Sequence, residues 1–311
     1  MRSIYTFNFN FHLTSLFELE TRQIFGKETT DKVLFTDIKV DASISPFIKT
    51  RFDILFSCDD YSSLLQKVKA ASLHKEGFKA EYLILPGDKT DYKERLNKLR
   101  DIGMRIEGFP DYKDPTIIYS ICQTEESWYF GILEKHNTDW YKHKNKPHSF
   151  SNSLSMDLAK SLVCISSKGD KSVSILDGCC GVGTVMLEGC VAGFQIEGCD
   201  ISKHSTHYTV QNLSHYGYQA AIHHCDIGEL RNNYDTTIID LPYNLYSYSD
   251  DTITLNIISS AAKISQRVVI VSISDIKEVI HQSNMKVIDY CEVKKKGKST
   301  FKRNIWVCEG V

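Results

Sequence analysis

Four aspartates in the second half of the chain stand where carboxylates could act together on one ligand. Asp177, Asp200, Asp226 and Asp240 each come at the end of a short apolar or strand-like run. The carboxyl ends of parallel strands meet at one edge of a sheet, and open α/β sheets bind their ligands there. Carboxylates at such an edge can accept hydrogen bonds from ribose hydroxyls or from amino groups. We therefore expect a ligand crevice lined by these residues.

The first aspartate opens a glycine-rich stretch, Asp177-Gly178-Cys179-Cys180-Gly181-Val182-Gly183-Thr184, between a predicted strand and a predicted helix. Glycine lets the backbone turn tightly and approach a ligand, with helix amides behind it. Asp200 follows about 20 residues later, the spacing at which a carboxylate reaches a ribose. A glycine-tolerant turn in any α/β protein, with the aspartates acting as helix N-caps, is the alternative interpretation.

The fourth aspartate begins Asp240-Leu241-Pro242-Tyr243-Asn244. A carboxylate at a strand end can hydrogen-bond an exocyclic amine, proline stiffens the turn, and an aromatic ring can stack on a base. This pattern favours an enzyme that acts on an amino group of a nucleobase.

The elements that would position these residues alternate strictly after residue 157. Helices separate short apolar strands, which favours a parallel sheet with helices on both faces; the strands are expected at 173–176, 195–199, 220–223, 237–239 and 268–272. The runs 287–293 and 301–308 have no helix between them, so an antiparallel edge pair is predicted.

The first half of the chain has a different pattern, an α+β arrangement. The order of its first six elements is βαββαβ, the ferredoxin-like plan, with elements expected at 4–9, 13–25, 33–40, 47–56, 61–73 and 82–85. A helix at 93–100 and strands at 117–121 and 128–133 complete it. We expect an N-terminal domain at 1–135, a basic linker at 136–154 and a second domain at 155–311.

Composition narrows the protein class. The chain has 311 residues and a formal net charge of −2, which is ordinary for a globular protein and does not indicate a nucleic-acid partner by itself. Neither a membrane-spanning apolar stretch nor a secretory signal is predicted, so we expect a cytoplasmic protein with no membrane partner. The ten cysteines are dispersed, which favours free thiols and no metal site.

The glycine-rich stretch together with Asp240-Leu241-Pro242-Tyr243 resembles the amino-methyltransferases, whose pattern is an acid or Asn, two prolines and an aromatic. Leu241 departs from that pattern. The run from Lys146 to Val163 resembles the segment before the glycine loop in tRNA guanine-N2 methyltransferases, and Tyr5 to Phe9 resembles their N-terminus. The resemblance covers about half of the chain. It implies a Rossmann-like seven-stranded sheet and an enzyme that uses S-adenosyl-L-methionine.

The resemblance also implies roles for individual residues. Asp240, Leu241, Pro242 and Tyr243 would form the catalytic site, where the amine is oriented and the base is stacked. The cofactor would lie over the glycine loop, with its ribose on Asp200, its adenine near Asp226 and Ile227, and its methionine end covered by Phe150 and Ser153. The full set of expected cofactor residues is Phe150, Ser153, Asp177, Gly178, Cys179, Gly181, Gly183, Thr184, Asp200, Ile201, Asp226 and Ile227.

Two basic stretches could contact RNA, because concentrated positive charge suits phosphates; they supply Lys142, Lys144 and Lys146, and Lys294, Lys295, Lys296, Lys298, Lys302 and Arg303. Solvated loops are the alternative. We expect methylation of guanine N2 in tRNA or another structured RNA. A DNA or ribosomal-RNA amino-methyltransferase and a non-catalytic RNA-binding scaffold remain alternatives, and an accessory subunit is possible but not indicated.

Overall fold

The protein contains two separate β-sheets. The computed structural model describes residues 2–27, 29, 31–151, 153–242, 248–294 and 301–310. Each sheet lies in its own unit. The first unit comprises Met1–Asn8, Asp31–Ala42 and Phe47–His136, and the second comprises Phe9–Thr30, Ser43–Pro46 and Asn137–Val311. The chain therefore passes between the units several times before residue 137. No helix of the described residues is long and apolar enough to cross a membrane.

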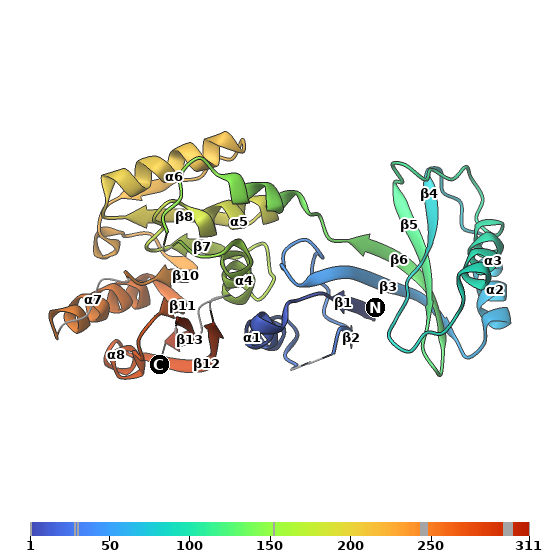
Figure 1. Cartoon of the computed structure of the whole chain (residues 1–311), viewed down its shortest axis with the longest axis horizontal. Helices are drawn as coiled ribbons and strands as arrows, with labels where there is room; N and C mark the ends of the chain where they lie inside the picture. Colours follow the sequence, from blue (N-terminus) through green and yellow to red (C-terminus); the bar gives the residue numbers. More distant parts are fainter. Residues whose placement is uncertain are drawn as a thin grey trace. The chain divides into compact units, whose positions relative to one another are not determined.

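The first unit has six strands in the order β2-β1-β3-β6-β5-β4. Helices α2 and α3 pack on the part of this sheet that contains β4, β5 and β6 (Figure 1), through Leu64, Val68 and Ile102. Asp60 and Asp91 cap these helices by accepting hydrogen bonds from backbone N–H groups at 2.9 Å. The elements are β1 (Ser3–Phe7), β2 (Val33–Thr36), β3 (Ile48–Cys58), α2 (Tyr61–Ala70), β4 (Phe78–Tyr82), α3 (Tyr92–Gly103), β5 (Ile117–Gln123) and β6 (Trp128–Lys135).

The ferredoxin-like plan predicted for the first half is not the topology that the structure shows. Strand β1 is antiparallel to both of its neighbours, β2 and β3. The helix expected to cross over from it, α1 (Thr14–Phe25), belongs to the second unit, where it contacts α4 (Met156–Ser167) and β12 (Met285–Lys294). The physical reason is its apolar face, which includes Leu16, Phe17 and Ile24 and is buried in that unit.

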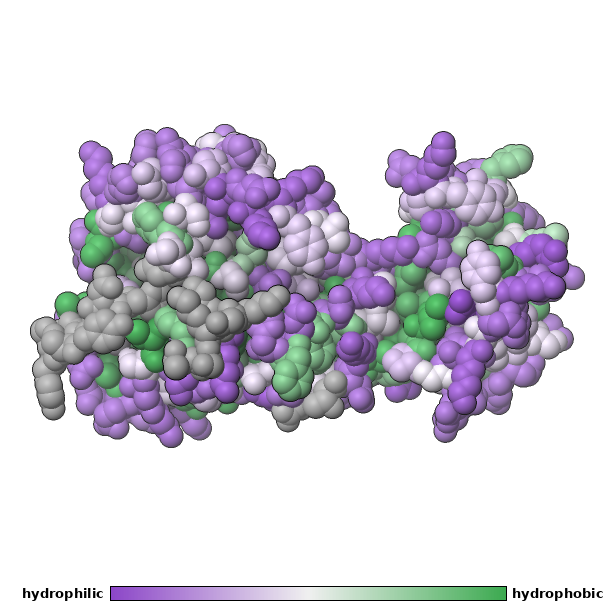
Figure 2. Space-filling model, in the orientation of Figure 1, coloured by the Kyte–Doolittle hydropathy of each residue, from purple (hydrophilic) through white to green (hydrophobic). Residues whose placement is uncertain are grey.

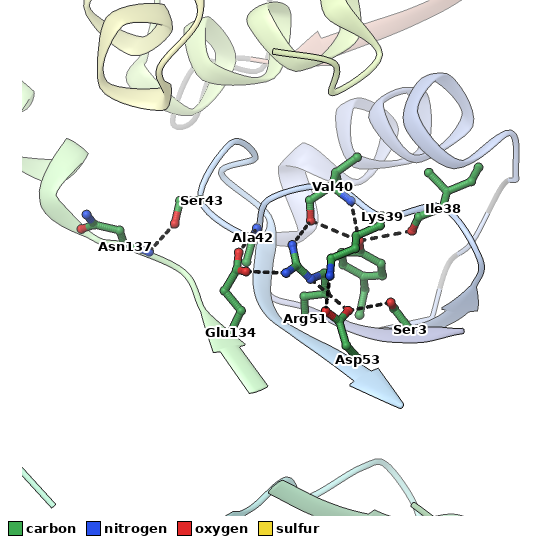
Figure 3. Close-up of polar contacts among 11 residues, drawn as sticks. Ser3, Ile38, Lys39, Val40, Ala42, Ser43, Arg51, Asp53, Glu134 and Asn137 are labelled. Carbon is green, nitrogen blue, oxygen red and sulfur yellow. Dashed lines mark hydrogen bonds and ion pairs between the residues drawn. The ribbon is translucent and has the colours of Figure 1, made fainter. Parts of the chain in front are cut away.

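A buried ion-pair network holds the middle of the first sheet (Figure 3). The Arg51 guanidinium bonds Asp53 at 3.1 Å and Glu134 at 2.5 Å, and it donates to the Val40 carbonyl at 2.7 Å. Burial acts to raise the pKa of Asp53, but hydrogen bonds from Lys39 and Ser3 and the Arg51 charge hold that pKa below its usual value. The network joins β3 to β6 and to the loop after β2.

The second unit contains the predicted parallel sheet, in the order β12-β13-β11-β10-β7-β8-β9. Neighbouring strands from β11 to β9 are parallel, while β13 is antiparallel to both β11 and β12. The predicted seven-stranded Rossmann-like fold with an antiparallel final pair is confirmed. Its strands are β7 (Ser174–Asp177), β8 (Gln195–Asp200), β9 (Ile222–His224), β10 (Tyr234–Asp240), β11 (Ser265–Ser272), β12 and β13 (Lys302–Gly310).

Helices bury both faces of this sheet. One layer runs from α1 through α4 and α5 to α6, and α7 and α8 form another (Figure 1). Alternating strand residues fill both interfaces: Ile239 packs in the cluster beneath α7 and α8, and the preceding Ile238 is equally buried. The remaining helices are α5 (Thr184–Ala192), α6 (Lys203–His215), α7 (Tyr248–Ile264) and α8 (Lys277–Gln282), with 3-10 turns η1 (Phe11–Leu13), η2 (Asp139–Asn145) and η3 (Ile227–Glu229).

The segment 136–154, predicted as a linker, is folded onto the second unit from Asn137 onward. Trp140 and His143 of η2 are 1% and 3% exposed, and the His143 imidazole bonds Glu188 of α5 at 2.9 Å. The polar residues around them suggested a solvated loop, but the buried rings anchor the segment. Elsewhere the surface is mainly hydrophilic on the face that Figure 2 shows, with hydrophobic residues in patches.

Candidate functional site

A cavity of about 450 Å³ lies at the carboxyl ends of β7, β8 and β10. It brings together most of the residues predicted to bind cofactor or act in catalysis, namely Phe150, Ser153, Asp177, Cys179, Gly181, Thr184, Asp200, Asp240, Leu241 and Pro242. Strands β7 and β10 are neighbours in the sheet. From β7 the chain continues to β8 and β9 on one side of β7, and it then crosses to β10 on the other side. This reversal is the topological switch point at which open α/β sheets bind ligands.

The glycine loop forms one wall of the cavity through its backbone. Gly181 and Gly183 have φ angles of +53° and +77°, a conformation that other residues rarely adopt. The Gly181 N–H donates to the Asp200 carboxylate at 2.9 Å, and the Gly181 carbonyl accepts from the Thr209 hydroxyl of α6 at 2.7 Å. Gly183 is the N-cap of α5. The end of β8 and the buried face of α6 therefore hold the loop in place.

Asp177 is the most buried acid of the cavity, at 2% exposure. Within the described part of the chain, its Oδ2 atom has no hydrogen-bond partner. Burial raises the pKa of Asp177 well above its usual value, and the nearby carboxylates of Asp240 and Asp200 raise it further. Three carboxyl groups thus influence one another in one cavity, and a positively charged group placed among them would favour the charged form of Asp177.

The Asp200 carboxylate supports the loop as well as facing the cavity. Besides the Gly181 N–H, it accepts the Ser202 N–H at 2.8 Å. Each carboxylate oxygen has two lone-pair directions, so these bonds leave capacity for hydroxyl groups of a ligand.

Asp240 ends β10 in the centre of the sheet, opposite Val271 of β11. The next residue, Leu241, is 5% exposed, and its N–H donates to the Val271 carbonyl at 3.0 Å. This bond ties the start of the turn to the sheet although a leucine stands at that position. Pro242 lines the cavity beside it. Tyr243, predicted to stack on the base, lies outside the described residues.

Some predicted cofactor residues do not line the cavity. Ile201 is 72% exposed, and Asp226 is an exposed N-cap whose carboxylate accepts the Gly228 N–H at 2.7 Å. Ile227 is buried in the core. Its Cδ1 would lie 2.8 Å from a Cβ at Gly178, so glycine at 178 serves packing as well as the turn. Gly178 and Gly183 do not line the cavity either.

Sequence patterns missed several residues of the cavity. Apolar lining comes from Leu154, Val182 and Val185, and polar lining comes from Ser202 and Ser205. Ser202 caps α6 by accepting the Ser205 N–H at 3.2 Å. The spacing of these serines just after Asp200 was a usable signal, because it marks a helix start at a strand end. The apolar residues carry no such signal.

The predicted basic stretches have mixed placements. Lys142, Lys144 and Lys294 are exposed, whereas burial lowers the pKa of the half-buried Lys146. Lys302 pairs with a neighbouring glutamate at 2.6 Å. Arg303 is 6% exposed, so its prediction as a surface phosphate contact is not supported; its guanidinium lies 5.0 Å from the Phe301 ring centre. Lys295, Lys296 and Lys298 lie outside the described residues.

Part of the chain is similar in sequence to a curated tRNA (guanine(10)-N2)-dimethyltransferase. That protein, from Methanothermobacter thermautotrophicus, is 29% identical over 120 residues, or 37% of this chain, and the chain spans about a third of its length (35%). No family model matches the chain.

Solved structures with a similar arrangement include TrmN from Thermus thermophilus, at 12% identity over the whole of both chains and a TM-score of 0.48. Another is a magnesium protoporphyrin IX methyltransferase from Synechocystis, at 16% identity over 56% of this chain and 93% of that one, with a TM-score of 0.44.

Proposed function

We propose that the protein transfers a methyl group from S-adenosyl-L-methionine to an exocyclic amine of a base in RNA, with guanine N2 in tRNA as the target. The observation that carries this proposal is the single cavity at the switch point. In it, the glycine loop and Asp200 adjoin Asp240, Leu241 and Pro242. A binding site for a nucleoside and a site for an amine thus share one space.

The cavity fits a cationic nucleoside cofactor. The partnerless Oδ2 of Asp177 is a buried acceptor that suits the ammonium of an amino acid group. The carboxylates of Asp200 and Asp240 suit a sulfonium, and its positive charge would favour the charged form of Asp177. When bound, the cofactor would supply a methyl group on a positively charged sulfur, open to displacement by an amine nitrogen.

Each wall would contribute a separate contact to that cofactor. Asp200 would accept hydrogen bonds from the ribose hydroxyls while its other lone pairs hold Gly181 and Ser202. Phe150 and Ser153 line the cavity and would cover the methionine end. The adenine contacts assigned to Asp226 and Ile227, and the cofactor contact assigned to Ile201, remain predictions.

Asp240 would contact the substrate amine directly. Its carboxylate accepts a hydrogen bond from the amine, aims the nitrogen lone pair and stabilises the positive charge that develops there. The Leu241 carbonyl would accept a second amine hydrogen. The bond from the Leu241 N–H to the Val271 carbonyl holds the preceding peptide, between Asp240 and Leu241, against the sheet. An aspartate is a weak base toward an amine, so orientation matters more than early proton removal. Tyr243 would stack on the base.

RNA as the substrate class is supported by the curated relative, whose name specifies tRNA. Exposed Lys142, Lys144 and Lys294 could contact phosphates. The chain spans about a third of that relative's length. We therefore put forward tRNA as the substrate and N2 of guanine as the target atom as proposals.

The test combines binding with product analysis. Calorimetry should show binding of S-adenosylmethionine, and mass spectrometry of nucleosides from tRNA incubated with enzyme and cofactor should show methylated guanosine. Asp240→Ala should lower single-turnover methyl transfer by on the order of 10²–10³, and Asp240→Asn by less, because the amide keeps one acceptor. Asp235→Ala is the matched control, since Asp235 lies at the opposite end of the same strand.

Three results would contradict the proposal in different ways. A protein that does not bind the cofactor would be a scaffold. Methylation of DNA or ribosomal RNA in place of tRNA would support the methyl-transfer reaction and contradict tRNA as the substrate. Near-parental rates for Asp240→Ala would remove Asp240 from the catalytic site.

A further inference from the structure

Residues 148–151 and Ser153, the described part of the segment 148–153, form one wall of the cavity, called the outer wall below, through a short turn. The Ser153 N–H donates to the Phe150 carbonyl at 3.1 Å, and the Phe150 N–H donates to the Ser153 hydroxyl at 3.2 Å. Both residues line the cavity. These bonds shape the turn, but they do not determine where the turn lies against the glycine loop, so another contact must fix it there.

One carboxamide, that of Asn212 in α6, makes this contact. Its Oδ1 accepts the His148 N–H at 2.9 Å, and its Nδ2 donates to the His148 carbonyl at 2.9 Å and to the Val182 carbonyl at 2.8 Å. The side chain is fully buried, with 0% exposure. Asn212 therefore joins the beginning of the outer wall to the glycine loop through three hydrogen bonds.

The chemistry of these partners specifies asparagine. A backbone N–H needs an acceptor, and two carbonyls need donors, so only one orientation of a carboxamide satisfies all three. Aspartate of the same size would bring a carboxylate toward two carbonyl oxygens. Alanine would leave the three backbone groups without this partner in a buried place, which is costly.

A second attachment supports the same arrangement. The His148 ring stacks on Tyr208, with ring centres 3.9 Å apart and planes 6° from parallel. Tyr208 lies one helical turn before Asn212 on α6, and Thr209 between them bonds the Gly181 carbonyl at 2.7 Å. One helix face thus holds both walls of the cavity.

We propose that Asn212 is a positioning residue for the cofactor site. It fixes the segment 148–153 against the glycine loop, so that Phe150 and Ser153 meet the cofactor in a preformed place. This inference rests on the proposed function, and it adds a residue that contacts neither cofactor nor substrate. Without Asn212 the segment would sample other positions, and the apparent affinity would fall with the fraction in the competent one.

The experiment measures the dissociation constant of S-adenosylmethionine by calorimetry for the full chain and its variants. Asn212→Ala and Asn212→Asp should each weaken binding by about tenfold or more. Gln211→Ala is the matched control, because Gln211 is the exposed neighbour on the same helix, and it should bind like the parent. Thermal denaturation identifies any variant that fails to fold. Asn212→Ala adds no buried charge and Asn212→Asp leaves no empty volume, so the two variants perturb folding in different ways.

A double-mutant cycle separates positioning from general damage to the fold. In a Phe150→Ala, Ser153→Ala background the segment has little left to position, so adding Asn212→Ala should change the affinity less than twofold. An equal loss in both backgrounds, or parental affinity for folded Asn212→Ala and Asn212→Asp, would overturn the inference. If the parent itself does not bind the cofactor, the proposed function fails and the role of Asn212 fails with it.

Discussion

Two glycines with nearly the same backbone conformation allow the packing of the glycine loop to be measured. Gly183 and Gly217 have φ angles of +77° and +78°. A Cβ at Gly217 would meet nothing within 4 Å, whereas a Cβ at Gly183 would lie 2.6 Å from Thr209 Cγ2. Alanine at both sites incurs the same left-handed strain, and only Gly183→Ala adds a steric conflict.

The expected losses follow from these two contributions. Gly217→Ala should lower the free energy of unfolding by about 1–2 kcal/mol, the usual cost of the left-handed conformation. Gly183→Ala should lose about 1–3 kcal/mol more, as overpacked sites do. It should also weaken cofactor binding, since displacing Thr209 disturbs its bond to the Gly181 carbonyl.

Hydrogen exchange of the slowest amides in the strands of the second unit measures the stability of that unit alone. Thr209→Ser is the companion variant, because it removes Cγ2 and keeps the hydroxyl. Added to Gly183→Ala, it should recover part of the lost stability. Equal losses for the two glycine variants, or no recovery with serine, would refute the packing argument.

Other predictions concern charge. Asp200→Ala should weaken S-adenosylmethionine binding by at least tenfold in calorimetry, because it removes the ribose acceptor and also the partner of the Gly181 N–H. Burial raises the pKa of Glu20 to about 7. Its neutral form is favoured in the folded state, so the free energy of unfolding should fall as pH rises from about 4.5 to about 7, and Glu20→Gln should flatten that fall in denaturant titrations. Neutralising Lys142, Lys144 and Lys294 should reduce the slope of log affinity for tRNA against log salt by nearly one unit per phosphate contact, while an unchanged slope would make these lysines ordinary solvated residues.

The predicted convergence of Asp177, Asp200 and Asp240 is observed because it depends on one simple rule. Each residue ends a short apolar strand, and parallel strands that alternate with helices must present those ends at one edge. An aspartate at the end of a short apolar strand is a pattern local in sequence. It predicts the position of the carboxylate without knowledge of which strands are neighbours.

Residues whose roles depend on distant partners could not be predicted in the same way. Asn212 is a polar residue in a helix that looks solvent-exposed in sequence, and only the fold reveals the backbone groups it meets. Arg303 follows a lysine-rich run and yet is buried. Asp226 showed the expected strand-end position, but the cap of η3 occupies one of its oxygens. Composition does not distinguish these outcomes.

The predicted topology of the first half was wrong for a related reason. The amphipathic pattern of α1 was evident, but the pattern does not identify the surface that it covers. The assumption that a helix packs on the nearest strands in sequence placed it on the first sheet. Its actual neighbours, α4 and β12, begin more than a hundred residues later.

The distance between α1 and β12 along the chain also affects how the protein must be made. During synthesis, α1 leaves the ribosome about 260 residues before β12 begins. At the usual rate of ~5–20 residues per second, that interval is roughly 15 to 50 seconds. Throughout it, the apolar side of α1 has no strand β12 to cover it, and the first unit can be complete once residue 136 has been made. The nascent chain therefore exposes this apolar helix face until late in synthesis, and a fragment that starts after residue 136 would lack the helix that contacts α4 and β12.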